Sequence, residues 1–328
     1  MGDLPRNIYE QQSANRRNTI LVMTLFVLFF GFLGFGFDYF VLGFDVGPQG
    51  HGLFTFPAAT IVAMLVGLGG AFWSLENGSS TVLASSGAVQ VDPGDPRYQQ
   101  LVNVVEEMAI AAGEPRPAIY VIPDPDPNAF ATGKDPQHAS IAVTQGLLEK
   151  LNREELQGVI AHEMSHVRNY DIRTMTVVAA LIGAVMLISE FGLRSMRFGA
   201  GRRRSSSSRI GGTGGVIFFV LWLIAMLLAP LLSQILAMAV SRQREYLADA
   251  SGAELTRNPV ALASALEKID EAVEPTRSIK KGTAHLCIAD PLGSDKNERE
   301  GFLADLFATH PPVSKRITYL KAMAYQHA

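Results

Sequence analysis

Hydrophobic residues gather into long blocks that alternate with polar stretches along the chain. The first block covers residues 19–37 and the second covers residues 54–75, the latter without a charged residue. Each is long enough to cross a hydrocarbon core of about 30 Å as a helix that rises about 1.5 Å per residue. The pattern therefore predicts two N-terminal membrane-spanning helices, with the lipid bilayer as their surroundings.

Two further apolar blocks, residues 174–192 and 216–240, flank a Gly/Ser-rich loop that carries six arginines: Arg194, Arg197, Arg202, Arg203, Arg204 and Arg209. If both blocks cross the membrane, these arginines lie outside, against the positive-inside rule. If neither block crosses, the arginines stay inside and can hold anionic headgroups. We favour a hairpin of two spans.

The spacing of apolar residues and the positions of turn-forming residues indicate an α+β unit between the second and third apolar blocks. Helical spacing marks residues 97–112, and strand-like runs cover 118–122, 128–133 and 140–144. Asn152 followed by Glu155 resembles a capping box that opens a helix through Val167. The predicted division is 1–80 for a membrane anchor, 81–173 and 242–328 for two parts of one catalytic domain that is mainly helical, and 174–241 for the hydrophobic pair.

Charge sets the orientation and excludes one class of partner. With 28 Lys and Arg against 31 Asp and Glu, the chain lacks the basic excess typical of a nucleic-acid-binding protein. Arg6, Arg16 and Arg17 precede the first block, whereas the loop 38–52 has neither Lys nor Arg. The positive-inside rule then places the N-terminus and the later polar segments on the cytoplasmic side of the membrane. We expect a multi-pass protein of the plasma (inner) membrane.

The helix opened at Asn152 carries the sequence His162-Glu163-Met164-Ser165-His166. Residues four apart share one helical face, so both imidazoles can reach one zinc ion. Glu163 lies a step around the helix, where it can take a proton from the attacking water instead of binding the metal. The alternative is a surface helix that holds two histidines by chance.

A catalytic zinc ion needs a third protein ligand. Directly after the last apolar block, Glu245 and Asp249 are four residues apart and share a helical face. We assign Glu245 to the metal and Asp249 to the orientation of a ligand histidine. The alternative is a pair of solvated carboxylates near Arg242 and Arg244.

Three segments in this order carry a family resemblance: residues 144–171, the SRQREYLAD run at 241–249 and the THPPVSKRI run at 309–317. Together they resemble the HtpX-type membrane zinc metalloproteases, a family that also contains the CAAX prenyl proteases. The resemblance implies a membrane-anchored zincin-like domain with a short β-sheet, an active-site edge strand and four hydrophobic helices. It also implies one zinc ion on His162, His166 and Glu245, with Glu163 as general base.

The same resemblance suggests a substrate-binding edge strand, formed by Asn128, Ala129, Phe130, Ala131 and Thr132. An exposed edge strand can bind an unfolded peptide through backbone hydrogen bonds. The alternative is an ordinary strand and turn.

His310 and Arg316 match two further family elements, and either could stabilise the oxyanion of the tetrahedral intermediate. Equally, Arg316 could pair with a structural carboxylate such as Asp249.

These features predict a zinc-dependent endopeptidase at the cytoplasmic face of the membrane. By resemblance its substrates are damaged or misassembled membrane proteins, in a stress-response role of protein quality control. One rival is a selective processing protease of the CAAX type. The other is a non-enzymatic zinc-binding chaperone or scaffold, which would have no need of the general base Glu163.

Overall fold

The computed structural model describes residues 8–42, 56–182, 242–272, 276–279, 283–291 and 311–326. Its backbone contacts divide the chain into two compact units. We call Ile20–Ser74 with Leu181–Gln234 the helical unit, and Met1–Thr19, Leu75–Ala180 and Ile235–Ala328 the mixed unit. The described part is mainly helical with one small mixed sheet, which agrees with the predicted α+β class.

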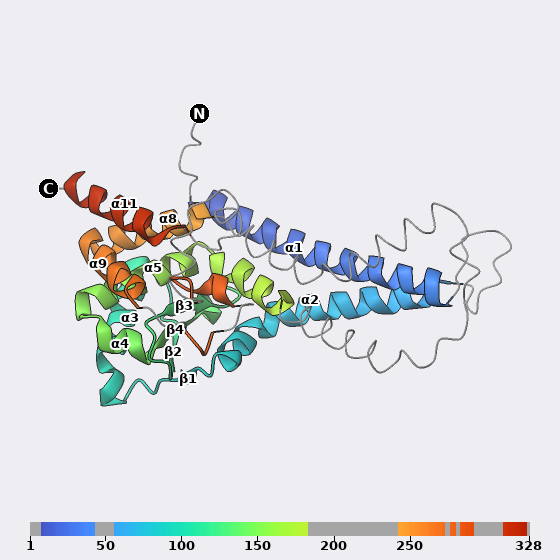
Figure 1. The fold of residues 1–328 in the computed structure, drawn as a ribbon, viewed down its shortest axis with the longest axis horizontal. Coiled ribbons are helices and arrows are strands. Elements are labelled where there is room, and N and C mark those ends of the chain that lie inside the picture. The colour runs from blue at the N-terminus through green and yellow to red at the C-terminus, as the bar shows by residue number, and fades with distance from the viewer. Residues whose placement is uncertain are drawn as a thin grey trace. The chain divides into compact units, whose positions relative to one another are not determined.

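The helical unit holds most of two long apolar helices, α1 (Ile8–Phe37) and α2 (Ala58–Ser85), which run side by side (Figure 1). The stretches Glu10–Phe40 and Ala58–Ser85 are long and apolar enough to span a membrane, and only 22% and 17% of an apolar 18-residue window in each are buried. Large apolar side chains stay exposed on both, among them Ile20, Leu28, Val62, Leu65 and Phe72. The first two predicted spans are therefore present as helices.

Two contacts hold these helices together within the helical unit. Asp38, at the start of the π-helical turn Asp38–Leu42, accepts hydrogen bonds from the backbone N–H groups of Ala59 (2.9 Å) and Thr60 (2.7 Å). The carboxylate thereby caps the N-terminus of α2. At Gly34, a Cβ atom would lie 2.7 Å from the Thr60 Cα, so the close approach of the helices requires glycine here.

The other two predicted hydrophobic helices, 174–192 and 216–240, lie mostly outside the described residues. Of the first block only residues 174–182 are described, and they belong to a helical stretch that covers 171–182. Four hydrophobic helices and their hairpin topology therefore stay a prediction.

The mixed unit contains a four-stranded sheet with the order β1-β2-β4-β3. β1 (Val89–Gln90) pairs antiparallel with β2 (Ala118–Ile122), β2 pairs parallel with β4 (Ser140–Thr144), and β4 pairs antiparallel with β3 (Ala129–Thr132). The three strands predicted from the sequence are confirmed, and β3 is an edge strand. The two-residue strand β1 was not predicted, because so short a segment carries no readable alternation.

The helices of the mixed unit surround α5 (Arg153–Arg168), which contacts β3 and three helices, namely α3 (Gln99–Ala112), α8 (Arg242–Thr256) and α9 (Pro259–Asp270). The short α4 (Gln145–Lys150) follows β4, and α11 (Val313–Gln326) packs against α8 and α9 (Figure 1). Three 3-10 turns, Pro96–Tyr98, Pro136–His138 and Ala284–Leu286, complete the described elements. α5 is thus the central, buried element of this unit.

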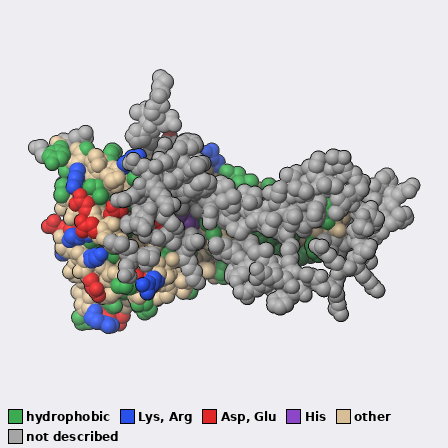
Figure 2. All heavy atoms as spheres, viewed as in Figure 1, with side chains coloured by type: hydrophobic (Ala, Val, Ile, Leu, Met, Phe, Trp, Pro, Cys, Tyr) green, Lys and Arg blue, Asp and Glu red, His purple; other side chains and the backbone are tan. Residues whose placement is uncertain are grey.

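The surface of the mixed unit is mixed in charge. On the face shown in Figure 2, acidic and basic side chains are interspersed over the described residues. Such a distribution differs from the basic stripe of a nucleic-acid-binding domain. The expectation that nucleic acid is not a partner stays a prediction.

Candidate metal centre

The helix that carries the two histidines begins at a reciprocal cap. The Asn152 side chain accepts a hydrogen bond from the Glu155 N–H (3.0 Å), and the Glu155 carboxylate accepts one from the Asn152 N–H (2.9 Å). This is the predicted capping box, which satisfies two orphan donors and fixes where α5 starts. His162 and His166 then follow on one face, 0% and 3% exposed, with ring centroids 4.9 Å apart.

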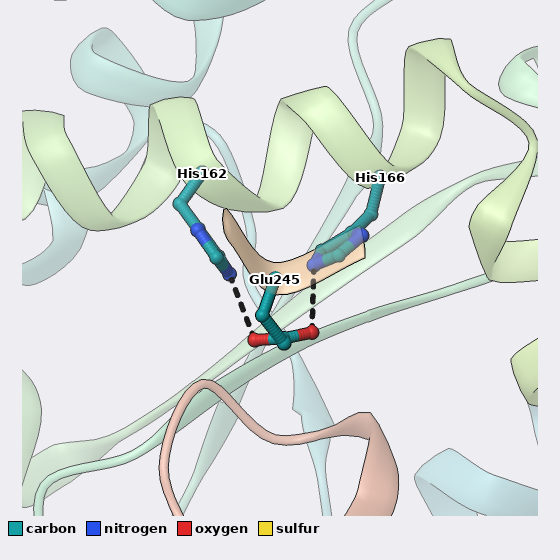
Figure 3. Close-up of side chains that lie close together, drawn as sticks. All are labelled: His162, His166 and Glu245. Atoms are coloured by element: carbon teal, nitrogen blue, oxygen red, sulfur yellow. Dashed lines mark ion pairs between the residues drawn. The ribbon is translucent and has the colours of Figure 1, made fainter. Parts of the chain in front are cut away.

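Helix α8 brings Glu245 against the two imidazoles. α8 crosses α5 at Gly252, where a Cβ atom would lie 3.0 Å from the His162 backbone nitrogen. Because glycine has no side chain, the two helices approach closely at this point. Figure 3 shows His162, His166 and Glu245 pointing toward one another, and their ligand atoms all lie within 4.8 Å of one another.

The distances within this cluster fit a shared cation better than hydrogen bonds. The Glu245 carboxylate oxygens lie 3.7 Å from His162 Nε2 and 3.5 Å from His166 Nε2 (Figure 3). These separations are long for hydrogen bonds. Two ligands at about 2.0–2.2 Å from one tetrahedral ion lie about 3.4 Å apart. His162 Nε2 is also buried with no hydrogen-bond partner in the described part of the chain, so the donor set fits a metal ion.

The second ring nitrogen of His162 faces a carboxylate, as expected for a metal-ligating histidine. Asp249 Oδ1 lies 3.0 Å from His162 Nδ1. The Arg316 guanidinium donates to both oxygens of Asp249, from Nε (2.8 Å) and Nη2 (2.7 Å). Burial opposes ionisation of Asp249, but the charge and hydrogen bonds of Arg316 outweigh it and lower the pKa of this carboxyl. Asp249 thus lies beside the ring nitrogen that an orienting carboxylate would face, and its orienting role stays a prediction.

A different carboxylate faces His166. Asp171 Oδ2 lies 3.2 Å from His166 Nδ1, and both residues are buried. Burial lowers the pKa of His166, but Asp171 and the other nearby carboxylates outweigh burial and raise this pKa above its ordinary value, to about 9. A metal ion must therefore displace a proton when it binds this ring. From the sequence alone, Asp171 had no assigned role.

The signal that could have identified Asp171 is its place just beyond the metal helix. α5 ends at Arg168 with Asn169 as its C-cap, and Tyr170 adopts a left-handed backbone conformation with φ of 60°. This reversal returns the next side chain toward the last turn of α5. A carboxylate placed directly after such a reversal is a candidate orienting group. The sequence shows where Asp171 stands along the chain, but the reversal itself is visible only in the structure.

Glu163 is 1% exposed and is not one of the three converging ligands. Burial raises the pKa of Glu163 above its ordinary value, and the nearby His162 and His166 oppose that rise. A buried glutamate with a raised pKa, next to the metal ligands, suits proton transfer.

The predicted substrate strand is buried, with all four residues of β3 between 0% and 2% exposed. Part of its outer edge is already paired, because the Ile288 N–H donates to the Ala129 carbonyl (2.9 Å) and Phe130 forms a bridge with Cys287. The Asn128 side chain donates to Thr276 and to the Ala289 carbonyl. Asn128 therefore anchors neighbouring loops, and a peptide role for β3 stays a prediction.

The two predicted oxyanion residues differ in what the structure describes. His310 lies outside the described residues. Arg316 is 0% exposed, pairs with Asp249 as the stated alternative anticipated, and also donates to the Ile288 carbonyl (2.6 Å). Its Nη1 lies 3.5 Å from Glu245, so Arg316 adjoins the metal cluster. A direct oxyanion role stays a prediction for both residues.

Comparison with known proteins places this arrangement in a family. The model of peptidase family M48 matches residues 96–324. A protease HtpX homolog of Caldanaerobacter subterraneus subsp. tengcongensis is 46% identical over 321 residues, which cover 97% of this chain and 98% of that protein. A protease HtpX homolog of Ligilactobacillus salivarius is 40% identical over 316 residues, covering 96% and 100%. The crystal structure of S. mikatae Ste24p shares 18% identity at a TM-score of 0.48, covering 95% of this chain and 67% of that one. With a family model that matches most of the chain and relatives that align along nearly their whole length, the chain belongs to peptidase family M48.

Proposed function

We propose that this membrane-bound metalloprotease holds one zinc ion on His162, His166 and Glu245 and uses Glu163 as its general base. The observation that carries the proposal is the convergence of two imidazole nitrogens and one carboxylate within 4.8 Å, all buried. Two histidines and one carboxylate form a common protein ligand set of catalytic zinc, which keeps a further position open.

In this proposal the chain's own residues supply binding and proton transfer. Zinc held here would act as a Lewis acid toward the scissile carbonyl. Glu163 takes a proton from the attacking water and delivers it to the leaving amine. Asp249 and Asp171 hold the two imidazoles in the tautomer and orientation that binding requires. Hydrolysis then needs no Ser or Cys nucleophile.

The proposed substrates are unfolded segments of membrane proteins, cut at the cytoplasmic face in protein quality control. The edge position of β3 supports backbone pairing with an extended peptide, because such pairing depends little on sequence. Since Ile288 already donates to the Ala129 carbonyl, a peptide must displace it or pair farther along the strand. The arginines before the first span support a cytoplasmic site.

Cleavage of an unfolded protein tests the chemistry. Detergent-solubilised wild type and the Glu163→Gln variant are compared for casein cleavage and for bound zinc. The matched control is Glu154→Gln, an exposed glutamate on the same helix. We expect Glu163→Gln to lose activity by about 10²–10⁴-fold while it keeps its zinc, because only the proton-transfer group is removed. Equal cleavage by Glu163→Gln and Glu154→Gln would refute the assignment of the base.

A further inference from the structure

We propose that Asn15, on the helix that leads into the first membrane span, is a positioning residue for the metal ligand His166 and acts through Asp171. This inference rests on the proposed ligand set, because it concerns the orientation of one ligand. It extends the metal centre to a residue 151 positions before His166 in the sequence.

The first part of α1 belongs to the mixed unit and contacts the segment that follows the metal helix. Gln12 donates to the Arg168 carbonyl (2.9 Å), and Arg16 lies over the Tyr170 ring with its Cζ 4.8 Å from the centroid. The Thr19 and Thr174 hydroxyls lie 2.9 Å apart. These contacts fix the backbone turn that carries Asp171.

Asn15, on the same part of α1, hydrogen-bonds to the side chain of Asp171. Its Nδ2 donates to Asp171 Oδ1 (2.7 Å) and to the Asn169 carbonyl (2.9 Å). The other oxygen of Asp171, Oδ2, faces His166 Nδ1 at 3.2 Å. One carboxylate thus lies between Asn15 and a metal ligand, with one oxygen for each.

The orientation of the Asn15 amide is determined by its two partners. Both are oxygen acceptors, so the NH₂ group must point toward them, and the opposite orientation would place oxygen against oxygen. Asn15 is only 5% exposed, so water does not readily replace these bonds. Arg244 also adjoins Asp171, but its Nη1 is 3.5 Å from Oδ1, beyond good hydrogen-bonding distance.

Removal of the amide would leave the Asp171 carboxylate free to rotate away from His166. Partners behind a ligand histidine typically contribute a factor of 10–100 in metal affinity. Asn15 stands one contact farther out than Asp171, so its effect should lie at the lower end of this range. The helix that enters the membrane would then also complete the metal centre.

The test measures zinc affinity of the full-length protein by competition with a chromogenic chelator. The variants are Asn15→Ala, Asp171→Ala and the double variant, with Gln12→Ala as the matched control. Gln12 joins the same two segments through a hydrogen bond to the Arg168 carbonyl. We expect about tenfold weaker zinc binding for Asn15→Ala, unchanged binding for Gln12→Ala, and no further loss when Asn15→Ala is added to Asp171→Ala.

His166→Ala tests the proposed zinc ligands separately from the role of Asn15. If it retains zinc, the proposed ligand set fails. If it loses zinc while Asn15→Ala binds like wild type, the ligand set stands and the role of Asn15 is refuted. Additive losses in the double variant would also refute the role, because Asn15 would then act independently of Asp171. Should Asn15→Ala fail to fold, Asn15→Ser keeps a donor in a smaller volume, and its affinity should fall between those of wild type and Asp171→Ala.

Discussion

The two histidines proposed to bind the metal are supported in different ways. Behind His162, Asp249 is 0% exposed and receives two hydrogen bonds from the buried guanidinium of Arg316. Behind His166, Asp171 is 3% exposed and receives one short hydrogen bond from the neutral amide of Asn15. The first carboxylate has a full charge partner within hydrogen-bonding distance, whereas the second has a neutral one and a more distant arginine.

This difference separates stability from orientation. Two opposite charges buried together make the fold depend on both, because either charge alone would be uncompensated. A neutral amide can hold a carboxylate in place without that dependence. We therefore expect the His162 support to contribute to folding and to metal binding, and the His166 support to contribute mainly to metal binding.

The largest expected effect follows from removing the charge behind His162. Arg316→Met leaves the Asp249 carboxylate without its charge partner in the core, which should lower the free energy of unfolding by about 3–5 kcal/mol. Denaturant unfolding in detergent measures the loss. Arg244→Met, beside Asp171, is the matched change on the other side and should cost less, since Arg244 is 14% exposed and 3.5 Å away. A similar loss of unfolding free energy for both variants would contradict the expected difference between the His162 and His166 sides.

A double variant sharpens this result. Arg316→Met combined with Asp249→Leu removes both charges, and apolar replacement of a buried pair is often neutral or stabilising. The double variant should therefore recover much of the unfolding free energy that Arg316→Met loses. Failure to recover would mean that Arg316 acts mainly through other contacts, such as its hydrogen bond to the Ile288 carbonyl.

The second effect concerns metal affinity on both sides. Asp249→Asn and Asp171→Asn should each weaken zinc binding by about 10–100-fold, because each removes the carboxylate that faces a ligand ring. Asp249→Asn should show the larger loss, since it also leaves the buried Arg316 without its charge partner. Chelator competition and bound-zinc content measure both. Wild-type affinity in either variant would contradict the orienting role of that carboxylate.

The sequence predicted the His162 side better than the His166 side, for a physical reason. His162 and His166 on α5, and Glu245 and Asp249 on α8, each stand at helical spacing, so the helical period predicts the common face of each pair without knowledge of the fold. Asp171 follows a left-handed turn at Tyr170, and Asn15 reaches it from a distant helix. Neither contact follows from helical spacing, because the first depends on the turn at Tyr170 and the second on how α1 packs in the mixed unit.

The same limit applies to the fold. The capping box and three strands were predicted because local patterns define them, whereas the contacts of α1 were not. The predicted boundary at residue 80, which treats the whole N-terminal region as a membrane anchor, stays a prediction. By backbone contacts, Met1–Thr19 groups with the mixed unit and the division near α2 falls at Leu75. Apolar length predicts a span, but it does not indicate which polar residues at its end pack elsewhere.

The third effect perturbs the His162 side through the backbone. Gly252→Ala would place a Cβ atom 3.0 Å from the His162 nitrogen and 3.1 Å from its Cα. Alanine favours a helix by about 1 kcal/mol over glycine, but overpacking against backbone costs about 1–3 kcal/mol. We expect a net loss of unfolding free energy together with weaker zinc binding, because α8 and His162 must move apart.

Gly158→Ala is the matched control for that variant. Its Cβ atom would meet the Leu262 backbone at 3.0 Å, on a side of α5 that faces α9. Both variants should lower the free energy of unfolding, but only Gly252→Ala should weaken zinc binding. Equal zinc affinities would show that the crossing at Gly252 does not position His162.

The smallest effect concerns an ion pair between a buried carboxylate at the start of the same helix and a partly exposed lysine. Glu155, at the start of α5, accepts from Lys268 Nζ (2.7 Å), whose side chain is 40% exposed. Burial opposes ionisation of Glu155, but hydrogen bonds from Lys268, Asn152 and Ser264 outweigh it and lower its pKa. Lys268→Ala should therefore cost at most about 1 kcal/mol at pH 7.

The pH dependence of this pair has a definite sign. A depressed carboxyl pKa contributes stability that is present above the unfolded value of about 4.3 and is lost as the pH falls through the lower folded value. The difference in unfolding free energy between wild type and Lys268→Ala should thus shrink toward zero below about pH 4. Lys321→Ala, which breaks the exposed pair with Glu267, serves as the control with little effect at either pH. If this difference in unfolding free energy grows as the pH falls, Lys268 stabilises the fold through its packing instead of its charge.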